Sequence, residues 1–298
     1  MLYCSHMTNN YERGIHSTMF AKLTKRIFSL VLIACLLLSL CACFGLSSLF
    51  EDDYYDYFKD PEKPNTEEED IAETTDTMSG EGRIFAKGID VSKWQADNVD
   101  FNEVKNAGYD FVIIRCGSSK GKDDCFEQFY TEAKEAGLDV GTYYYSYAVT
   151  AEEAATDAAN CLSFIEGKQF EYPIYFDFED ISQITLDVTL CANICNTFLR
   201  RIRSAGYLPG LYSMASVMEK KWITSLGLRK DYEGWIANFS DDGTYNELGD
   251  TYSKKFGMYQ YTDKLYIGDY GPYDGNVAYK DYPKIIKESG LNGYDPFS

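Results

Sequence analysis

The chain has 298 residues, enough for one large or two ordinary domains, and a formal net charge of −19. This acidic balance argues against a nucleic-acid-binding surface, which needs clustered Lys and Arg. The two histidines, His6 and His16, both lie near the N-terminus, so the rest of the chain can form neither a Ser-His or Cys-His nucleophile pair nor a histidine-ligated zinc site. Its chemistry must therefore rest on carboxylates.

The N-terminal segment has the pattern of an export signal. Basic residues at 22–26 precede an apolar run at 27–40 that is short for a membrane span. The sequence Leu-Cys-Ala-Cys at 40–43 resembles a bacterial lipobox, with Cys43 as the lipidated residue. We interpret residues 1–50 as a signal peptide or membrane anchor, either a lipoprotein signal or an uncleaved signal anchor. The remainder is then expected outside the cytoplasm, membrane-anchored or secreted.

Residues 51–83 are predicted to be an acidic, disordered linker. Within them, 51–82 contains 13 acidic residues, 2 basic residues, two Pro and almost no aliphatic side chains. Such a segment cannot bury enough apolar surface to order itself, and repulsion between its charges keeps it extended. We expect it to act as a spacer before a folded domain at 84–298.

From residue 84 onward, short apolar runs alternate with amphipathic stretches, which is typical of βα units. Ala-Gly pairs close several of the amphipathic stretches, as helix C-caps do. Repeated units of this kind predict an α/β fold, an irregular TIM-like β/α barrel, because the later strands lack full helices between them. The predicted strands are Ala86–Val91, Phe111–Gly117, Val140–Tyr147, Ile174–Glu179, Pro209–Ser213, Gly234–Asn238 and Phe256–Tyr261. The predicted helices are 99–107, 126–136, 151–166 and 185–205.

The predicted strand at 174–179 ends in two carboxylates. Asp177 and Glu179 are two residues apart, so on a strand they project from one face. Because two close carboxylates cannot both ionise cheaply, one should hold its proton to a higher pH. A protonated acid beside an ionised partner is what cleavage of a glycosidic bond requires. Taken alone, an Asp-x-Glu at a strand end is more often a pair of surface acids.

Further acids and aromatic residues fall at the carboxyl ends of other predicted strands, where barrel enzymes carry their reactive groups. Asp90 ends the first strand and Arg115 the second, and Asp274 is predicted to lie in a turn at 274–277. The remaining members are Tyr143, Tyr145 and Tyr147 on one face of the third strand, Tyr212 on the fifth, and Trp235 and Gln260 on later strands. This gathering at one rim is the strongest argument for a site.

Seven motifs occur in the order "GIDVSKWQ", "DVGTYYYSYA", "YPIYFDFED", "GLYS", "GWIANF", "MYQYT" and "DGNV". Together they resemble glycoside hydrolase family 25, the Chalaropsis-type lysozymes, over about residues 84–280. The resemblance implies a barrel of about five βα units and three further strands. It also implies an N-acetylmuramidase that cleaves the β-1,4 bond between N-acetylmuramic acid and N-acetylglucosamine in peptidoglycan. Asn238-Phe239 departs from the family's usual polar residue followed by Tyr, which concerns a local contact.

The resemblance also implies roles for individual residues. Glu179 matches the general acid of the family and Asp177 its partner. Asp90 matches the acid of the first-strand motif, and Asp274 that of the late Asp-x-Asn motif. The residues expected to bind the glycan strand are Arg115, Tyr143, Tyr145, Tyr147, Tyr212, Trp235 and Gln260. No metal or cofactor is expected.

The second catalytic step leaves two routes open. Asp177 lies on the same predicted strand face as Glu179, which makes attack from the opposite face of the sugar difficult. We therefore expect the substrate's 2-acetamido group to attack C1, with Asp177 orienting it. An inverting route through water is the alternative. A different function, a non-catalytic peptidoglycan-binding surface lipoprotein, also stays open.

The cysteines after residue 83 do not form a disulfide ladder. Cys191 and Cys195 are one helical turn apart in an apolar segment, which predicts buried free thiols. A Cys116–Cys125 disulfide across the intervening loop stays open.

Overall fold

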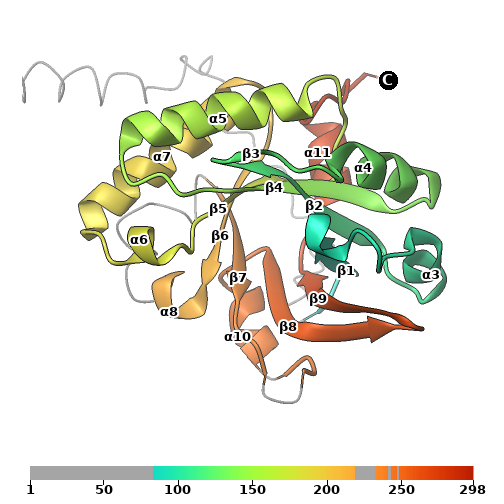
Figure 1. Ribbon diagram of the computed structural model, residues 1–298. Helices are drawn as coiled ribbons and strands as arrows, with labels where there is room; N and C mark the ends of the chain where they lie inside the picture. Colours follow the sequence, from blue (N-terminus) through green and yellow to red (C-terminus); the bar gives the residue numbers. More distant parts are fainter. Residues whose placement is uncertain (1–82, 219–231, 241–242, 247, 298) are drawn as a thin grey trace, which may run out of the picture. The chain divides into compact units, whose positions relative to one another are not determined.

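The computed structural model describes residues 83–218, 232–240, 243–246 and 248–297, which are coloured in Figure 1. They all belong to one compact unit, Thr77–Ser298. The predicted signal peptide or anchor, the lipidation site at Cys43 and almost all of the predicted linker lie outside the described residues. Among the helices that are described, none is both long and apolar enough to cross a bilayer.

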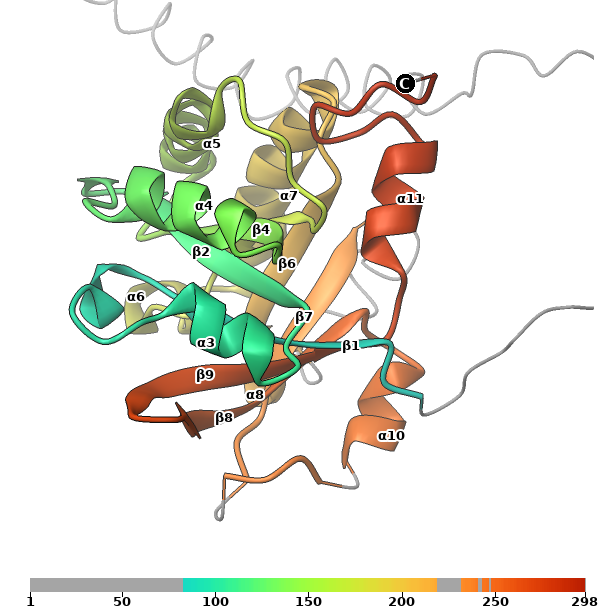
Figure 2. The same ribbon diagram turned by 90° about the vertical axis from the view of Figure 1, so that its right-hand side faces the viewer.

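Eight strands close into a barrel, and a short ninth strand, β3, pairs alongside β2. Within the barrel, neighbouring strands pair in parallel in the order β1, β2, β4, β5, β6, β7 and β8. Strand β9 lies between β8 and β1, is antiparallel to both, and completes the ring. Figures 1 and 2 show this arrangement from two sides. The strands are β1 Ala86–Val91, β2 Phe111–Ser118, β3 Gly121–Lys122, β4 Asp139–Tyr145, β5 Ile174–Asp177, β6 Pro209–Met214, β7 Glu233–Ala237, β8 Met258–Ile267 and β9 Tyr270–Ala278.

Helices follow the first five barrel strands, so the predicted order of βα units followed by three further strands is confirmed. The predicted irregular α/β barrel is confirmed with it. Helices α4, α5 and α7 pack on the outer faces of β2, β4, β5 and β6. The helical elements are η1 Lys93–Gln95, α3 Phe101–Asn106, α4 Phe126–Glu135, α5 Ala151–Ile165, α6 Ile181–Ile184, α7 Val188–Ser204, α8 Ala215–Val217, α10 Leu248–Ser253 and α11 Tyr282–Glu288.

Local sequence explains where the main helices start and stop. Helix α5 begins at a capping box, in which Thr150 Oγ1 accepts the Glu153 N–H and Glu153 Oε2 accepts the Thr150 N–H, both at 3.2 Å. Gly137 after α4 and Gly206 after α7 have φ of 77° and 85°, a left-handed conformation in which glycine has no steric penalty. These caps place each helix end so that the next strand re-enters the barrel.

The barrel interior is filled by aromatic rings below its open end. The rings of Phe111 and Tyr172 stack at 4.2 Å, and the Tyr175 and Trp235 rings lie 5.0 Å apart. All four side chains are buried, and each contributes about 1.5–3 kcal/mol to stability by leaving water. Because these rings close the barrel from below, the rim above them is a cavity with a floor and not a pore.

The expected turn at 274–277 is wrong, because these residues lie inside β9 and pair with β8 on one side and β1 on the other. Asp-Gly often marks a hairpin turn. Here Gly275 instead makes room for packing, since a Cβ on it would lie 2.8 Å from Thr262 and 2.9 Å from Tyr261. The chain reverses earlier, between β8 and β9, where Gly268 has φ of 58°.

None of the described cysteines forms a disulfide with another described cysteine. Cys191 and Cys195 are buried in α7, as predicted. The Cys116–Cys125 disulfide is not formed. Cys116 faces outward from β2 to α5, where its Sγ lies 3.8 Å from Cys161 Sγ. Cys125 is instead held at the start of α4, where its backbone N–H donates a hydrogen bond to Asp123 Oδ1.

Candidate active site

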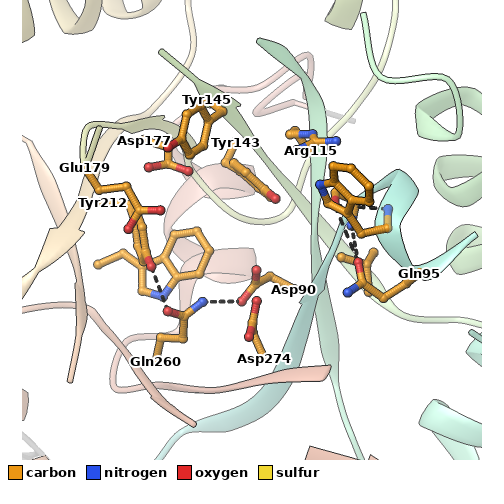
Figure 3. Close-up of a pocket in the computed structure, with 14 residues that line it drawn as sticks. Asp90, Gln95, Arg115, Tyr143, Tyr145, Asp177, Glu179, Tyr212, Gln260 and Asp274 are labelled. Atoms are coloured by element: carbon orange, nitrogen blue, oxygen red, sulfur yellow. Dashed lines mark hydrogen bonds between the residues drawn. The ribbon is translucent and has the colours of Figure 1, made fainter. Parts of the chain in front are cut away.

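A cavity of about 220 Å³ opens at the carboxyl ends of the parallel strands (Figure 3). Four of its side chains form one lateral row, because Tyr145 on β4, Asp177 on β5, Tyr212 on β6 and Trp235 on β7 are successive register partners. Register partners on neighbouring strands lie side by side, so these four positions form a continuous row. Residues far apart in the sequence therefore meet as a wall of the cavity.

The opposite wall is built around Asp90, which is a buried carboxylate on β1. Its Oδ2 atom accepts hydrogen bonds from Gln260 Nε2 and Asn276 Nδ2, both at 2.7 Å. The Trp235 indole N–H donates to Asn276 Oδ1 at 2.8 Å, and the Tyr212 hydroxyl donates to Gln260 Oε1 at 2.8 Å. The two amides thus connect Asp90 to the aromatic row and hold its carboxyl in one orientation.

Asp90 and Asp274 face each other across β1 and β9, where they are register partners (Figure 3). Burial is the main reason that the pKa of Asp90 lies well above its usual range, and the Asp274 charge adds to it. Burial also raises the pKa of Asp274, to about 6. This wall of the cavity therefore favours the protonated form of its two acids more than solvent does.

Glu179 follows β5 on a segment that its neighbour fixes in place. The buried Phe178 donates its N–H to the Tyr212 carbonyl at 3.1 Å, and its own carbonyl accepts the Ser213 hydroxyl at 2.7 Å. With the Phe178 ring packed into the core 5.8 Å from Phe176, the Glu179 carboxyl is directed to the cavity, as Figure 3 shows. The strand itself ends at Asp177, two residues earlier than predicted.

The pKa of Glu179 is raised, first by burial and then by the charges of Asp274 and Asp180, while the Tyr212 hydroxyl acts in the opposite direction. The expected repulsion from the Asp177 carboxylate is not among the causes of this rise. The effect of that pair falls instead on Asp177, whose pKa lies well above its usual range because of burial, the Glu179 charge and the Asp90 charge. Both Asp177 and Glu179 therefore have raised pKa values, which disfavours the state in which both are ionised.

Asp177 differs from Asp90 in its hydrogen bonding. Its side chain is 4% exposed, and its Oδ1 atom has no hydrogen-bond partner among the residues that the structure describes. A buried oxygen without a partner is costly, so such atoms are uncommon and call for an explanation. Oδ1 is therefore available to a hydrogen-bond donor that enters the cavity.

Residues 89–270 match the family described as glycosyl hydrolases family 25. The chain belongs to family 25. The resemblance found in the motifs is thereby confirmed. The autolytic lysozyme of Clostridium acetobutylicum is 32% identical over 108 residues, which make up 34% of this chain and 32% of that protein. The matched part of this family 25 chain thus spans about a third of that relative's length.

Solved structures give the same fold. A bacterial lysozyme from Streptomyces coelicolor matches with a TM-score of 0.56 and 23% identity, over 70% of this chain and 96% of that chain. The modular autolysin LytC from Streptococcus pneumoniae, solved in complex with a synthetic peptidoglycan ligand, matches with a TM-score of 0.53 and 23% identity, over 64% of this chain and 46% of that chain. These likenesses show that the chain has the same barrel fold.

All but one of the side chains predicted for the site line this cavity, and the exception is Tyr147. Strand β4 ends at Tyr145, so the alternation of side chains does not continue to Tyr147. Tyr147 lines a separate cavity beside α5, with its ring under the Lys120 ammonium at 3.9 Å. The structure therefore does not bring Tyr147 to the cavity at the strand ends.

Arg115 lines the cavity but is already paired. Its Nε and Nη2 atoms lie 2.7 and 2.6 Å from Asp123 Oδ2, and the same oxygen accepts the Lys93 N–H at 3.2 Å. Asp123 thus ties the turn after β1 to β2, and sequence reasoning missed it. Its signal was weak, since it is one of two successive acids in a loop. The Arg115 charge lowers the pKa of Asp177, against the effect of burial.

Sequence reasoning also missed the side chains of the turn after β1. Ser92, Trp94 and Gln95 line the cavity, and the Trp94 side chain is 78% exposed. Gln95 Oε1 accepts the Ser92 N–H at 2.9 Å, which completes a capping box around η1. The Ser-x-x-Gln spacing inside "GIDVSKWQ" is a signal that could have predicted this turn and its outward Trp94.

Proposed function

We propose that this chain hydrolyses peptidoglycan, cleaving the β-1,4 bond between N-acetylmuramic acid and N-acetylglucosamine. The observation that carries the proposal is the set of four carboxyl groups, from Asp90, Asp177, Glu179 and Asp274, around one rim cavity. Membership of family 25 supports a glycosidase, and the lysozyme among its sequence relatives supports this substrate. Peptidoglycan glycan strands are the proposed partner.

Glu179 acts as the general acid in this proposal. Burial favours its neutral form, so the carboxyl still carries a proton at a pH where an exposed Glu has lost it. It donates that proton to the glycosidic oxygen while the bond between this oxygen and C1 breaks. The leaving sugar then departs as a neutral alcohol, and Glu179 is left as a carboxylate.

Asp177 positions the substrate's 2-acetamido group for the second half of the reaction. The amide N–H donates to Asp177 Oδ1, the atom that lacks a partner in the described part of the protein. This hydrogen bond favours the ionised carboxylate, which in turn stabilises positive charge on the amide as its oxygen bonds to C1. Water then attacks C1, the bond to the amide oxygen breaks, and Glu179 accepts the water proton. The configuration at C1 is retained.

Purified peptidoglycan and NMR of the released sugars test this function. We expect soluble muropeptides that end in N-acetylmuramic acid, with the β-anomer formed first. An initial α-anomer would contradict assistance by the acetamido group while leaving the hydrolase in place. Binding to the wall without release of muropeptides would contradict hydrolysis and favour a non-catalytic binding protein.

We further propose that the N-terminal segment attaches the enzyme to the outer face of the cytoplasmic membrane, through a lipid on Cys43, which becomes the first residue once the signal peptide is removed. The acidic linker would hold the barrel away from that surface, and a tethered enzyme would act in remodelling of the producer's own wall. Metabolic labelling with a clickable fatty acid tests the lipid. Label that is lost in Cys43→Ala supports a lipoprotein, and an unlabelled protein that stays in the membrane fraction supports a signal anchor.

A further inference from the structure

A second cavity, of about 200 Å³, lies next to the catalytic one and shares two of its residues, Glu179 and Tyr212. It is formed where β6 runs into α8 and where β7 ends, two neighbouring positions on the barrel rim (Figure 1). Its other walls include Met214, Ala237 and Phe239. The Glu179 carboxyl therefore stands at the boundary between two cavities.

The two cavities differ in charge. The catalytic cavity holds Asp90, Asp177 and Asp274 as well as Glu179, whereas the residues that line the second cavity include no acid other than Glu179. Positive charge develops at C1 of one sugar during the reaction, and carboxylates stabilise it. That sugar must lie in the acidic cavity. The sugar that leaves stays neutral, so an apolar cavity suits it.

Glu179 also defines which bond is broken. A general acid has to reach the oxygen between the two sugars. With its carboxyl on the boundary, one sugar lies in each cavity and the oxygen lies between them.

Two large apolar side chains are exposed in the second cavity. Met214 is 45% exposed and Phe239 is 43% exposed. The backbone next to Phe239 is well fixed by Asn238. The Asn238 backbone carbonyl accepts the Tyr259 hydroxyl at 2.7 Å, and the Asn238 side-chain Nδ2 donates to the Tyr252 hydroxyl at 2.7 Å. An exposed aromatic ring on a fixed backbone suits the CH face of a pyranose, which is the apolar side of an otherwise polar sugar.

We propose that this second cavity, with Met214 and Phe239 as its platform, binds the sugar that leaves, an N-acetylglucosamine if the proposed function is correct. The inference rests on that function and fixes the direction of the strand. N-Acetylmuramic acid lies over Trp235 in the acidic cavity, and the strand continues past Phe239 toward its reducing end.

The test compares two substrates that differ only in the leaving group. One is a soluble, uncross-linked glycan strand, and the other is the β-fluoride of the disaccharide N-acetylglucosaminyl-N-acetylmuramic acid, which has no leaving sugar. The quantity to compare is kcat/KM for the strand divided by kcat/KM for the fluoride. In Phe239→Ala, we expect this ratio to fall about tenfold from its wild-type value, because one ring contact with the leaving sugar is lost. Phe239→Tyr, which keeps the ring, should restore most of the ratio.

Tyr266→Ala is the matched control, because Tyr266 is an aromatic residue on β8 that is 63% exposed and lines neither cavity. The ratio should stay at the wild-type value in this variant. An equal loss on both substrates in Phe239→Ala, or an unchanged ratio in both Phe239→Ala and Met214→Ala, would overturn the assignment while the enzyme remains a muramidase. A wild-type protein that cleaves neither substrate would refute the proposed function, and this inference with it.

Discussion

Asp90 and Asp177 are buried to a similar extent in one cavity, yet their surroundings differ. Asp90 Oδ2 accepts hydrogen bonds from two amides, whereas Asp177 Oδ1 has no partner in the described part of the chain. The protein thus satisfies one carboxylate internally, and in the proposed mechanism the other is left to the substrate. The comparison separates acids that shape the site from acids that act on the sugar, and it can be tested from both sides.

The largest effect is expected for Glu179→Gln, which keeps the size of the side chain and removes its acidic proton. We predict that kcat on purified glycan strands falls by about 10²–10⁴-fold. The loss should be much smaller on the disaccharide β-fluoride, because fluoride leaves without a full proton transfer. An unchanged thermal unfolding temperature would show that the fold survives. Near-wild-type turnover on glycan strands would refute the role of Glu179.

Asp177→Asn tests the acid that is left to the substrate. The neutral amide cannot stabilise positive charge on the acetamido group, so we predict a loss of about 10²-fold in kcat. Stability should not fall, because Oδ1 has no partner within the described residues and the substitution removes repulsion with Glu179. Urea unfolding measures this second part. A clear loss of stability would mean that Asp177 is structural.

Asp90→Val tests the acid that the protein has satisfied. The amides of Gln260 and Asn276 lose their acceptor in a buried site, so we expect the free energy of unfolding to fall by about 1–3 kcal/mol. Asp177→Val is the matched control and should cost less. The comparison fails if the two valine variants are equally destabilised.

Asp274 predicts a pH dependence of stability. Its pKa is raised to about 6 by burial, so the folded state binds this proton more tightly than the unfolded chain, in which Asp titrates near about 3.9. The resulting stabilisation is complete below about pH 4 and is lost as pH rises through about 6. The side chain in Asp274→Asn does not titrate, so this variant does not lose stability at this position as the pH rises. The stability of this variant relative to wild type should therefore increase from pH 4 to pH 7, by up to roughly 3 kcal/mol. A difference that is constant with pH would contradict the shift.

The smallest effect is expected at Tyr147, which the sequence pattern groups with Tyr145. Because only Tyr145 lines the catalytic cavity, Tyr145→Ala should lower kcat/KM by roughly 3–10-fold, and Tyr147→Ala by less than about twofold. Equal losses on glycan strands would show that the cavity beside α5 also contacts the substrate.

Much of this site could be predicted because the signals were local. The strand at Ala86–Val91 was predicted to the residue, and the acids at strand ends followed from the parallel arrangement. The turn expected at 274–277 failed because pairing with β1 and β8 outweighed a local Asp-Gly signal. Asp123 and the exposed Trp94 were missed for a related reason, since their importance comes from contacts with residues distant in sequence.

The family, the order of βα units and the acids available for chemistry could all be predicted from the sequence. Apolar runs, helix caps and motif spacing are properties of neighbouring residues, so they can be read without coordinates. The surroundings of each acid, in contrast, depend on how the barrel closes. Closing the barrel buried Asp90 among amides from β8 and β9, left Asp177 Oδ1 without one, and put Glu179 between an acidic and an apolar cavity. These differences arise from which strands become neighbours, and that is a property of the closed ring.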